Sequence, residues 1–139
     1  MTDRDTRELT VRRLTSTGHR LLHYDGVCGN VHGHNMEWIV ELTISMEAAG
    51  EDNMPLDFKE VSDRIDATDH AVLLNENDPL VEHSDILGKV VTFKSDPTTE
   101  LLSQWMADKL VSEIDAVEKA TICINETPKY GMQATATES

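Results

Sequence analysis

The chain has 139 residues, of which 26 are Asp or Glu and 12 are Lys or Arg, so its formal charge is −14. This length suits one domain with its own hydrophobic core, and we expect a single domain over residues 1–139. The acidity argues against a nucleic-acid partner, because affinity for phosphate comes mostly from Lys and Arg. No apolar run approaches the ~20 residues of a membrane helix, and the polar residues 1–10 do not resemble a signal peptide.

Two cysteines, Cys28 and Cys123, are too few for a disulfide framework and suit a reducing cytoplasm. The acidic residues are spread along the chain rather than gathered in one tail. This pattern is typical of a halophilic surface in a salt-rich cytoplasm, and an ordinary acidic protein is the alternative. In either case an anionic substrate needs a local positive site to overcome the repelling field.

Two strands are predicted in the first third of the chain. Residues 7–17 mix Thr, Val and Leu with polar residues, which is typical of a strand. Residues 36–46 alternate between apolar and polar side chains, with Ile39 the exception, and predict a strand that buries one face. The insertion between them, residues 18–35, is rich in Gly and His.

A helix is predicted over residues 57–68, because Asp57 and Glu60 form a capping-box pair at its start. Three apolar residues share one stripe of this helix: Phe58, Val61 and Ile65. Residues 73–84 contain Asn, Asp and Pro and predict a loop. Residues 89–93 form a short apolar run that predicts an extended segment.

A second helix is predicted after Asp96 and Pro97, with Asp96 or Thr98 as the cap and Pro97 in the first turn. Its apolar face consists of Leu101, Leu102, Trp105, Met106, Leu110 and Ile114. Residues 120–125 alternate and predict a strand, and residues 130–137 predict a weaker one. Two hairpins separated by two helices favour an α+β fold, in which both helices cover one face of an antiparallel sheet.

Three histidines in and beside the insertion predict a metal site. His32 and His34 are two residues apart, so in an extended segment both side chains point the same way. A hairpin would bring His19, at the end of the preceding strand, next to them. Three His ligands with an open fourth position are the catalytic pattern for zinc, whereas a lone His-x-His pair is more often a surface feature.

Cys28 lies four residues before His32, in a Gly-rich loop that is an improbable place for a packed core residue. It could be a fourth ligand, which would close the site, or a thiolate that acts as nucleophile or base. Cys123 lies between two isoleucines in a predicted strand, which favours a structural role.

Asp69 and His70 follow the first predicted helix, and an Asp can orient an imidazole that moves protons. A plain histidine at a helix end explains this pair equally well. Glu126 ends an apolar strand. It is either a charged residue at a strand exit or a carboxylate that accepts paired hydrogen bonds from a ligand.

Taken together, these motifs resemble those of the family of 6-pyruvoyl-tetrahydropterin synthases and 6-carboxytetrahydropterin synthases. Two departures are Gly18, where Ala is usual, and Met36, where an aromatic residue is common. The segments that carry the resemblance are STGHRL (16–21), CGNVHGHN (28–35), PLDF (55–58), DHAVLLN (69–75), PTTE (97–100) and ET (126–127).

The resemblance implies the tunnelling fold, with a four-stranded antiparallel sheet, two helices and assembly into a barrel of sheets, and we expect a hexamer built as a dimer of trimers. It implies zinc on three histidines, Cys28 as a proton-abstracting thiolate, and Asp69 with His70 as the partner acid/base pair. It also implies that Glu126 anchors the pterin ring. The metal ligands that it implies are His19, His32 and His34. The further substrate-binding residues that we expect are Thr98, Thr99 and Glu100.

The implied substrate is 7,8-dihydroneopterin triphosphate. A 6-carboxytetrahydropterin synthase, a lyase, releases acetaldehyde and triphosphate, and its product serves queuosine or archaeosine synthesis. A 6-pyruvoyl-tetrahydropterin synthase eliminates triphosphate and keeps the side-chain carbons. The short, acidic chain favours the carboxy reaction. Two hypotheses from other functional classes remain. One is a zinc hydrolase that uses the three His with a metal-bound water, and the other is a non-catalytic zinc-binding module with Cys28 as fourth ligand.

Overall fold

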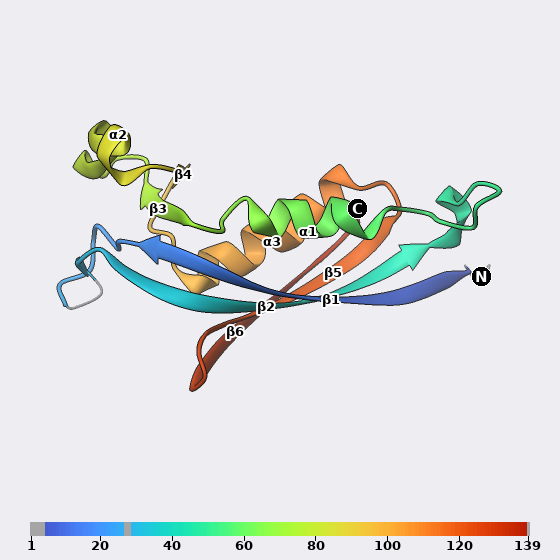
Figure 1. The fold of residues 1–139 in the computed structure, drawn as a ribbon. Coiled ribbons are helices and arrows are strands. Elements are labelled where there is room, and N and C mark those ends of the chain that lie inside the picture. The colour runs from blue at the N-terminus through green and yellow to red at the C-terminus, as the bar shows by residue number, and fades with distance from the viewer. Residues whose placement is uncertain (1–4, 27–28, 139) are drawn as a thin grey trace.

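The computed structural model describes residues 5–26 and 29–138. Within these residues one sheet holds six strands in the order β4-β3-β1-β2-β5-β6, and helices α1 and α3 lie on one side of it (Figure 1). The α+β architecture expected from the sequence is therefore confirmed. The expected four-stranded antiparallel sheet is wrong in detail, because two short parallel strands extend it.

Four long strands form the antiparallel part: β1 (Thr6–His19), β2 (His32–Ser45), β5 (Val117–Thr127) and β6 (Tyr130–Thr137). β2 lies at the centre and pairs with β1 on one side and β5 on the other. Its alternating residues become buried and half-buried or exposed in turn, as the sequence predicts. The segment that the sequence identifies most clearly as a strand is thus the central strand of this unit.

The extension consists of β3 (Ala71–Asn75) and β4 (Val90–Phe93), which pair in parallel with each other. β3 also pairs in parallel with the last residues of β1. The loop predicted over residues 73–84 is therefore wrong, because β3 enters it and two short helical turns follow, η3 (Pro79–His83) and α2 (Ser84–Leu87). The continuous apolar run of β3 is typical of a strand buried in a parallel sheet.

Helix α1 (Phe58–Asp66) begins at the predicted capping box, in which Asp57 accepts from the backbone and Glu60 reaches back to the cap. Val61 and Ile65 are buried against the sheet, whereas Phe58 is 64% exposed and leaves the predicted apolar stripe. A short 3-10 turn, η2 (Met46–Ala48), follows β2.

Helix α3 (Thr99–Glu113) is capped by Thr98, whose side chain accepts from the backbone N–H of Leu101. Thr98, and not Asp96, is therefore the cap. Pro97 precedes the cap rather than lying in the first turn. The helix packs against the hairpin formed by β5 and β6, which follow it in the chain.

The hydrophobic core lies between the helices and the sheet, and its largest fully buried side chains include Trp38, Met36, Leu42, Leu102, Met106 and Ile122. The Trp38 indole N–H donates to the buried Thr15 hydroxyl at 2.9 Å, so this polar group has a partner inside the core. No helix formed by the described residues is long and apolar enough to cross a membrane.

The surplus of acidic side chains leads to a prediction about salt. Mutual repulsion among dispersed carboxylates destabilises the folded state, and added salt screens it. We expect the melting temperature, measured by calorimetry, to rise steeply as KCl increases from low to molar concentration. A flat response over that range would instead identify an ordinary acidic protein.

Candidate metal centre

The hairpin of β1 and β2 brings the three predicted histidines together. In its register His19 lies opposite His32, and Thr17 lies opposite His34. Since His32 and His34 are two residues apart in β2, both side chains leave the same face of the sheet. The juxtaposition predicted from the sequence is therefore present, at the end of the hairpin where β1 finishes and β2 begins (Figure 1).

Two of the imidazoles are fixed through their Nδ1 atoms. His19 is 1% exposed, and its Nδ1 lies 2.9 Å from the carbonyl oxygen of Pro97. The Nδ1 atom of His32 lies 2.7 Å from the carbonyl oxygen of Asn30. A carbonyl can only accept, so each Nδ1 atom donates its proton, and in the neutral form of each ring the Nε2 atom presents a lone pair.

These two Nε2 atoms face each other at 2.9 Å. In the neutral tautomers set by the carbonyls neither Nε2 carries a proton to donate, so the two lone pairs repel. A shared cation removes this repulsion. A carbonyl behind each ring is also the usual outer partner of a metal-binding histidine, because it fixes the tautomer and the ring orientation.

His34 completes the group. Its Nε2 atom is buried and makes no hydrogen bond of acceptable geometry with the described residues, although Glu126 Oε1 approaches to 2.7 Å. Burial lowers the pKa of His34 below its ordinary value, and the charge of Glu126 opposes this effect. The neutral imidazole that results is the form that binds metals.

Glu126 reaches the histidines because β5 is irregular at this point. The pairing of β5 with β6 shifts register between Asn125 and Thr127, and such bulges often redirect a side chain beside a functional site. Glu126 Oε1 lies 3.5 Å from His19 Nε2.

The ligand atoms offered by the three histidines and Glu126 all lie within 4.8 Å of one another. Two ligands at zinc–nitrogen distances of about 2.0–2.1 Å lie roughly 3.3 Å apart in a tetrahedral site, so small movements would place this group around one ion. The donor set of imidazoles with one carboxylate suits zinc and other divalent transition metals. The residues present therefore fit a metal site.

The start of α3 lies beside this group, because Pro97 contributes the carbonyl that holds His19. Thr98 uses its side-chain oxygen as the helix cap, and the buried Thr99 donates to the carboxylate of Glu100 at 3.0 Å. Thr98 and Glu100 line an open groove with Trp105. The three residues predicted to bind substrate thus cluster at the helix start, and their role stays a prediction.

Comparison with known proteins identifies the family. The family described as 6-pyruvoyl tetrahydropterin synthase matches residues 8–137 of the chain. The chain belongs to this family. It is 34% identical over 117 residues to a probable 6-carboxy-5,6,7,8-tetrahydropterin synthase of Halobacterium salinarum, covering 81% of this chain and 76% of the relative.

Solved structures agree with the family assignment. The 6-pyruvoyl tetrahydropterin synthase of Caenorhabditis elegans is 25% identical, with a TM-score of 0.60 over 100% of both chains. The enzyme of that name from Plasmodium falciparum has a TM-score of 0.67 at 16% identity, covering 96% of this chain and 99% of the other. At that identity the likeness concerns the fold alone.

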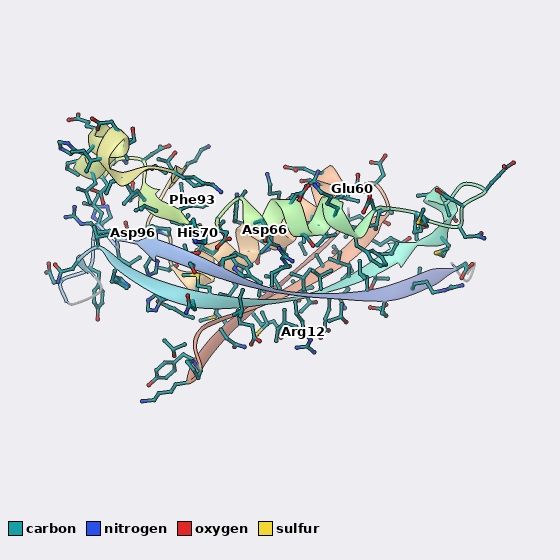
Figure 2. The ribbon with its side chains drawn as sticks, viewed as in Figure 1. Arg12, Glu60, Asp66, His70, Phe93 and Asp96 are labelled. Atoms are coloured by element: carbon teal, nitrogen blue, oxygen red, sulfur yellow. The ribbon has the colours of Figure 1, made fainter. Side chains whose placement is uncertain are left out.

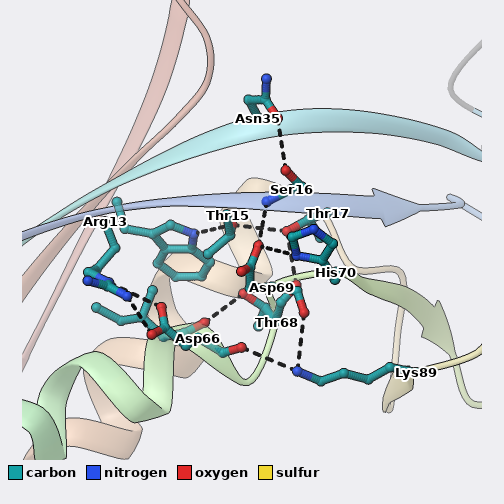
Figure 3. Close-up of polar contacts among 12 residues, drawn as sticks. Arg13, Thr15, Ser16, Thr17, Asn35, Asp66, Thr68, Asp69, His70 and Lys89 are labelled. Carbon is teal, nitrogen blue, oxygen red and sulfur yellow. Dashed lines mark hydrogen bonds and ion pairs between the residues drawn. The ribbon is translucent and has the colours of Figure 1, made fainter.

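The second predicted group, Asp69 and His70, lies on the outer edge of β1 (Figure 3). Asp69 Oδ1 accepts from the backbone N–H of Ser16 at 2.8 Å and lies 3.1 Å from His70 Nδ1. The hydrogen bond from Ser16 lowers the pKa of Asp69, so its carboxylate is ionised and can orient the imidazole. Among the described residues, no hydrogen bond or ion pair joins this pair to the three histidines.

The turn that carries His70 is held in an uncommon conformation. His70 has φ 54°, in the left-handed region, and its side chain is 80% exposed. Its backbone N–H donates to the Ser16 carbonyl at 2.7 Å, and Lys89 Nζ donates to the carbonyls of Asp66 and Asp69 (Figure 3). Strained backbone of this kind recurs at functional sites. An exposed, oriented imidazole is free to meet a group from outside its own chain.

Cys28, predicted as the proton-abstracting thiolate, lies outside the described residues. Cys123 is half-buried in β5 opposite Ile39, on the sheet face away from the helices, and its structural role stays a prediction. Sequence reasoning missed the two carbonyls that hold the histidine rings, because a backbone acceptor has no sequence signal. It also missed Lys89, because a lysine that donates to carbonyls twenty or more positions earlier has no local signal.

Proposed function

We propose that this chain converts 7,8-dihydroneopterin triphosphate to 6-carboxy-5,6,7,8-tetrahydropterin, with release of acetaldehyde and triphosphate, in the synthesis of a queuosine or archaeosine precursor in the cytoplasm. The observation that carries the proposal is the convergence of three imidazole Nε2 atoms, two of them aimed by carbonyls. Relatives named as 6-carboxy-5,6,7,8-tetrahydropterin synthases in Halobacterium salinarum, Pyrococcus abyssi and Aquifex aeolicus support the carboxy reaction.

In this proposal His19, His32 and His34 hold a zinc ion. When bound, zinc supplies a Lewis acid that makes protons next to the substrate hydroxyls more acidic. Glu126 accepts hydrogen bonds from the amino group and ring N–H of the pterin and fixes its orientation. Thr98, Thr99 and Glu100 contribute further contacts from the start of α3.

Two groups move protons. Cys28 takes a proton as a thiolate, and His70 exchanges one on the other side of the substrate side chain. The ionised Asp69 beside His70 Nδ1 favours the tautomer in which Nε2 is free to accept, and it stabilises the ring once protonated. The geometry within one chain supports the orientation of His70 by Asp69.

The test is to incubate the zinc-loaded protein with 7,8-dihydroneopterin triphosphate and identify the products by mass spectrometry, with acetaldehyde trapped as a hydrazone. The expected products are the 6-carboxy pterin and acetaldehyde. A 6-pyruvoyl product without acetaldehyde would establish the alternative activity. Absence of any turnover would favour a non-catalytic module.

The Cys28→Ala variant separates an open site from a closed one. If Cys28 moves protons, the variant keeps its zinc and loses turnover. If Cys28 is a fourth ligand of a structural site, the variant loses zinc as well.

The sheet leaves two long edges open among the described residues. β1 pairs with β3 only from Thr17 onward, so its earlier residues have no strand on that side, and β6 ends the strand order. Open edges are an aggregation hazard unless another strand covers them. We propose that β6 of one copy pairs with β1 of the next and closes the sheets into a barrel, which would place a neighbouring chain beside His70.

We therefore expect a homo-oligomer, a hexamer formed from two trimers. Multi-angle light scattering in high salt should give about six times the mass of the 15.5 kDa chain. A monodisperse monomer under the same conditions would contradict the assembly and leave His70 without access to a second chain.

A further inference from the structure

Asp96 connects three parts of the chain beside the metal site (Figure 2). One carboxylate oxygen accepts from the backbone N–H of Leu22 at 3.1 Å and from the amide of Asn75 at 3.0 Å. The other accepts from the backbone N–H of His23 at 2.9 Å. A single half-buried carboxylate thus joins the segment after β1, the end of β3 and the segment before α3.

These contacts close a ring around His19. Leu22 and His23 follow His19 by three and four residues, while Pro97, directly after Asp96, supplies the carbonyl oxygen 2.9 Å from His19 Nδ1. Both the chain that leaves His19 and the carbonyl that holds its ring are therefore anchored at one side chain. If Asp96 released them, the Pro97 carbonyl would no longer be fixed relative to the imidazole.

We propose that Asp96 is a positioning residue for the metal site, which holds the Pro97 carbonyl so that His19 keeps its Nδ1 proton and aims Nε2 at the ion. The inference rests on the proposed metal site and adds a residue that acts through His19 without touching the ion. Outer partners of metal-binding histidines typically change metal affinity 10- to 100-fold when removed. The carboxylate is suited to the task because it accepts three N–H groups, which an amide with one oxygen cannot do.

The experiment compares zinc affinity, measured by competition with a chromophoric chelator, in the wild type and in the variants Asp96→Ala and Asp96→Asn. We expect zinc binding about 10- to 100-fold weaker in Asp96→Ala and a smaller loss in Asp96→Asn, which keeps one acceptor and cannot serve all three donors. Asp96→Asn also serves if Asp96→Ala fails to fold. Circular dichroism establishes the fold of each variant.

The control is Asp57→Ala. Asp57 also accepts backbone N–H groups, as the cap of α1, but it lies with Ile44 and Met46 at the far end of β2 from the histidines. Loss of a helix cap destabilises the folded state, so this variant should melt at lower temperature with unchanged zinc affinity. It separates general destabilisation from an effect on the ion.

A second readout needs no metal. In nitrogen-detected NMR spectra of the metal-free protein, His19 should show a protonated Nδ1, and the Asp96 variants should show a mixture of tautomers. Unchanged zinc affinity and an unchanged His19 tautomer in folded Asp96 variants would overturn the positioning role and leave the metal site standing. If the wild type binds no zinc while the Asp96 variants still change the His19 tautomer, the metal site is overturned and only the positioning of the His19 ring by Asp96 stands.

Discussion

Replacing His32 with alanine should remove nearly all zinc from the purified protein. His32 Nε2 lies 2.9 Å from His19 Nε2, and its Nδ1 proton is committed to the Asn30 carbonyl, so the free nitrogen has no other role among the described contacts. Loss of a direct ligand should weaken binding by more than the roughly 100-fold that outer partners reach. Elemental analysis after dialysis against a mild chelator measures the effect.

The control is His83→Ala, which removes an exposed imidazole at the end of η3. This variant should retain about one zinc per chain, like the wild type. Full zinc retention in His32→Ala would refute the three-histidine site, because two imidazoles and a carboxylate would then be sufficient.

Replacing Glu126 with glutamine should greatly weaken the binding of a pterin analogue and leave the zinc content unchanged. The change keeps the size of the side chain but turns one acceptor oxygen into a donor that meets a donor on the pterin. An unmatched buried group costs about 1–3 kcal/mol, which corresponds to roughly 5- to 150-fold in Kd. Isothermal calorimetry with a non-reactive pterin provides the measurement.

Because Glu126 Oε1 lies 2.7 Å from His34 Nε2, the same variant also tests whether the carboxylate is a ligand. A large loss of zinc would make Glu126 part of the metal site. Equal pterin affinity with full zinc would make it a surface charge at a strand end. Glu113→Gln, at an exposed ion pair with Arg64 and Lys109, is the matched control and should change neither quantity.

Local pattern was enough to predict the parts of the fold that short-range chemistry dictates. The alternation in residues 36–46 predicted β2, and the pair Asp57 and Glu60 predicted the start of α1, because each signal lies within one turn or one strand. Two adjacent predicted strands indicated a hairpin, and the hairpin predicted that His19 and His32 lie next to each other.

The missed features depend on contacts between distant residues. β3 has only five residues and pairs in parallel with the end of β1, more than fifty positions earlier, so turn formers such as Asn75 and Pro79 dominated the local signal. Asp96 carries an ordinary capping signal, yet it binds Leu22, His23 and Asn75 instead. The bulge that turns Glu126 toward the histidines likewise depends on pairing with β6.

The hairpin of β5 and β6 also restricts how this protein can change during evolution or engineering. A Cβ atom at Gly131 would lie 2.2 Å from Asn125 Oδ1, and Asn125 in turn donates to Glu37 on β2 at 2.8 Å. A larger residue at 131 would therefore displace the Asn125 amide group, which bears on its hydrogen bond to Glu37. We expect a larger residue at 131 to be accepted more readily once Asn125 has been replaced by a smaller residue. Substitutions at the two positions should therefore be correlated, with the change at 125 coming first.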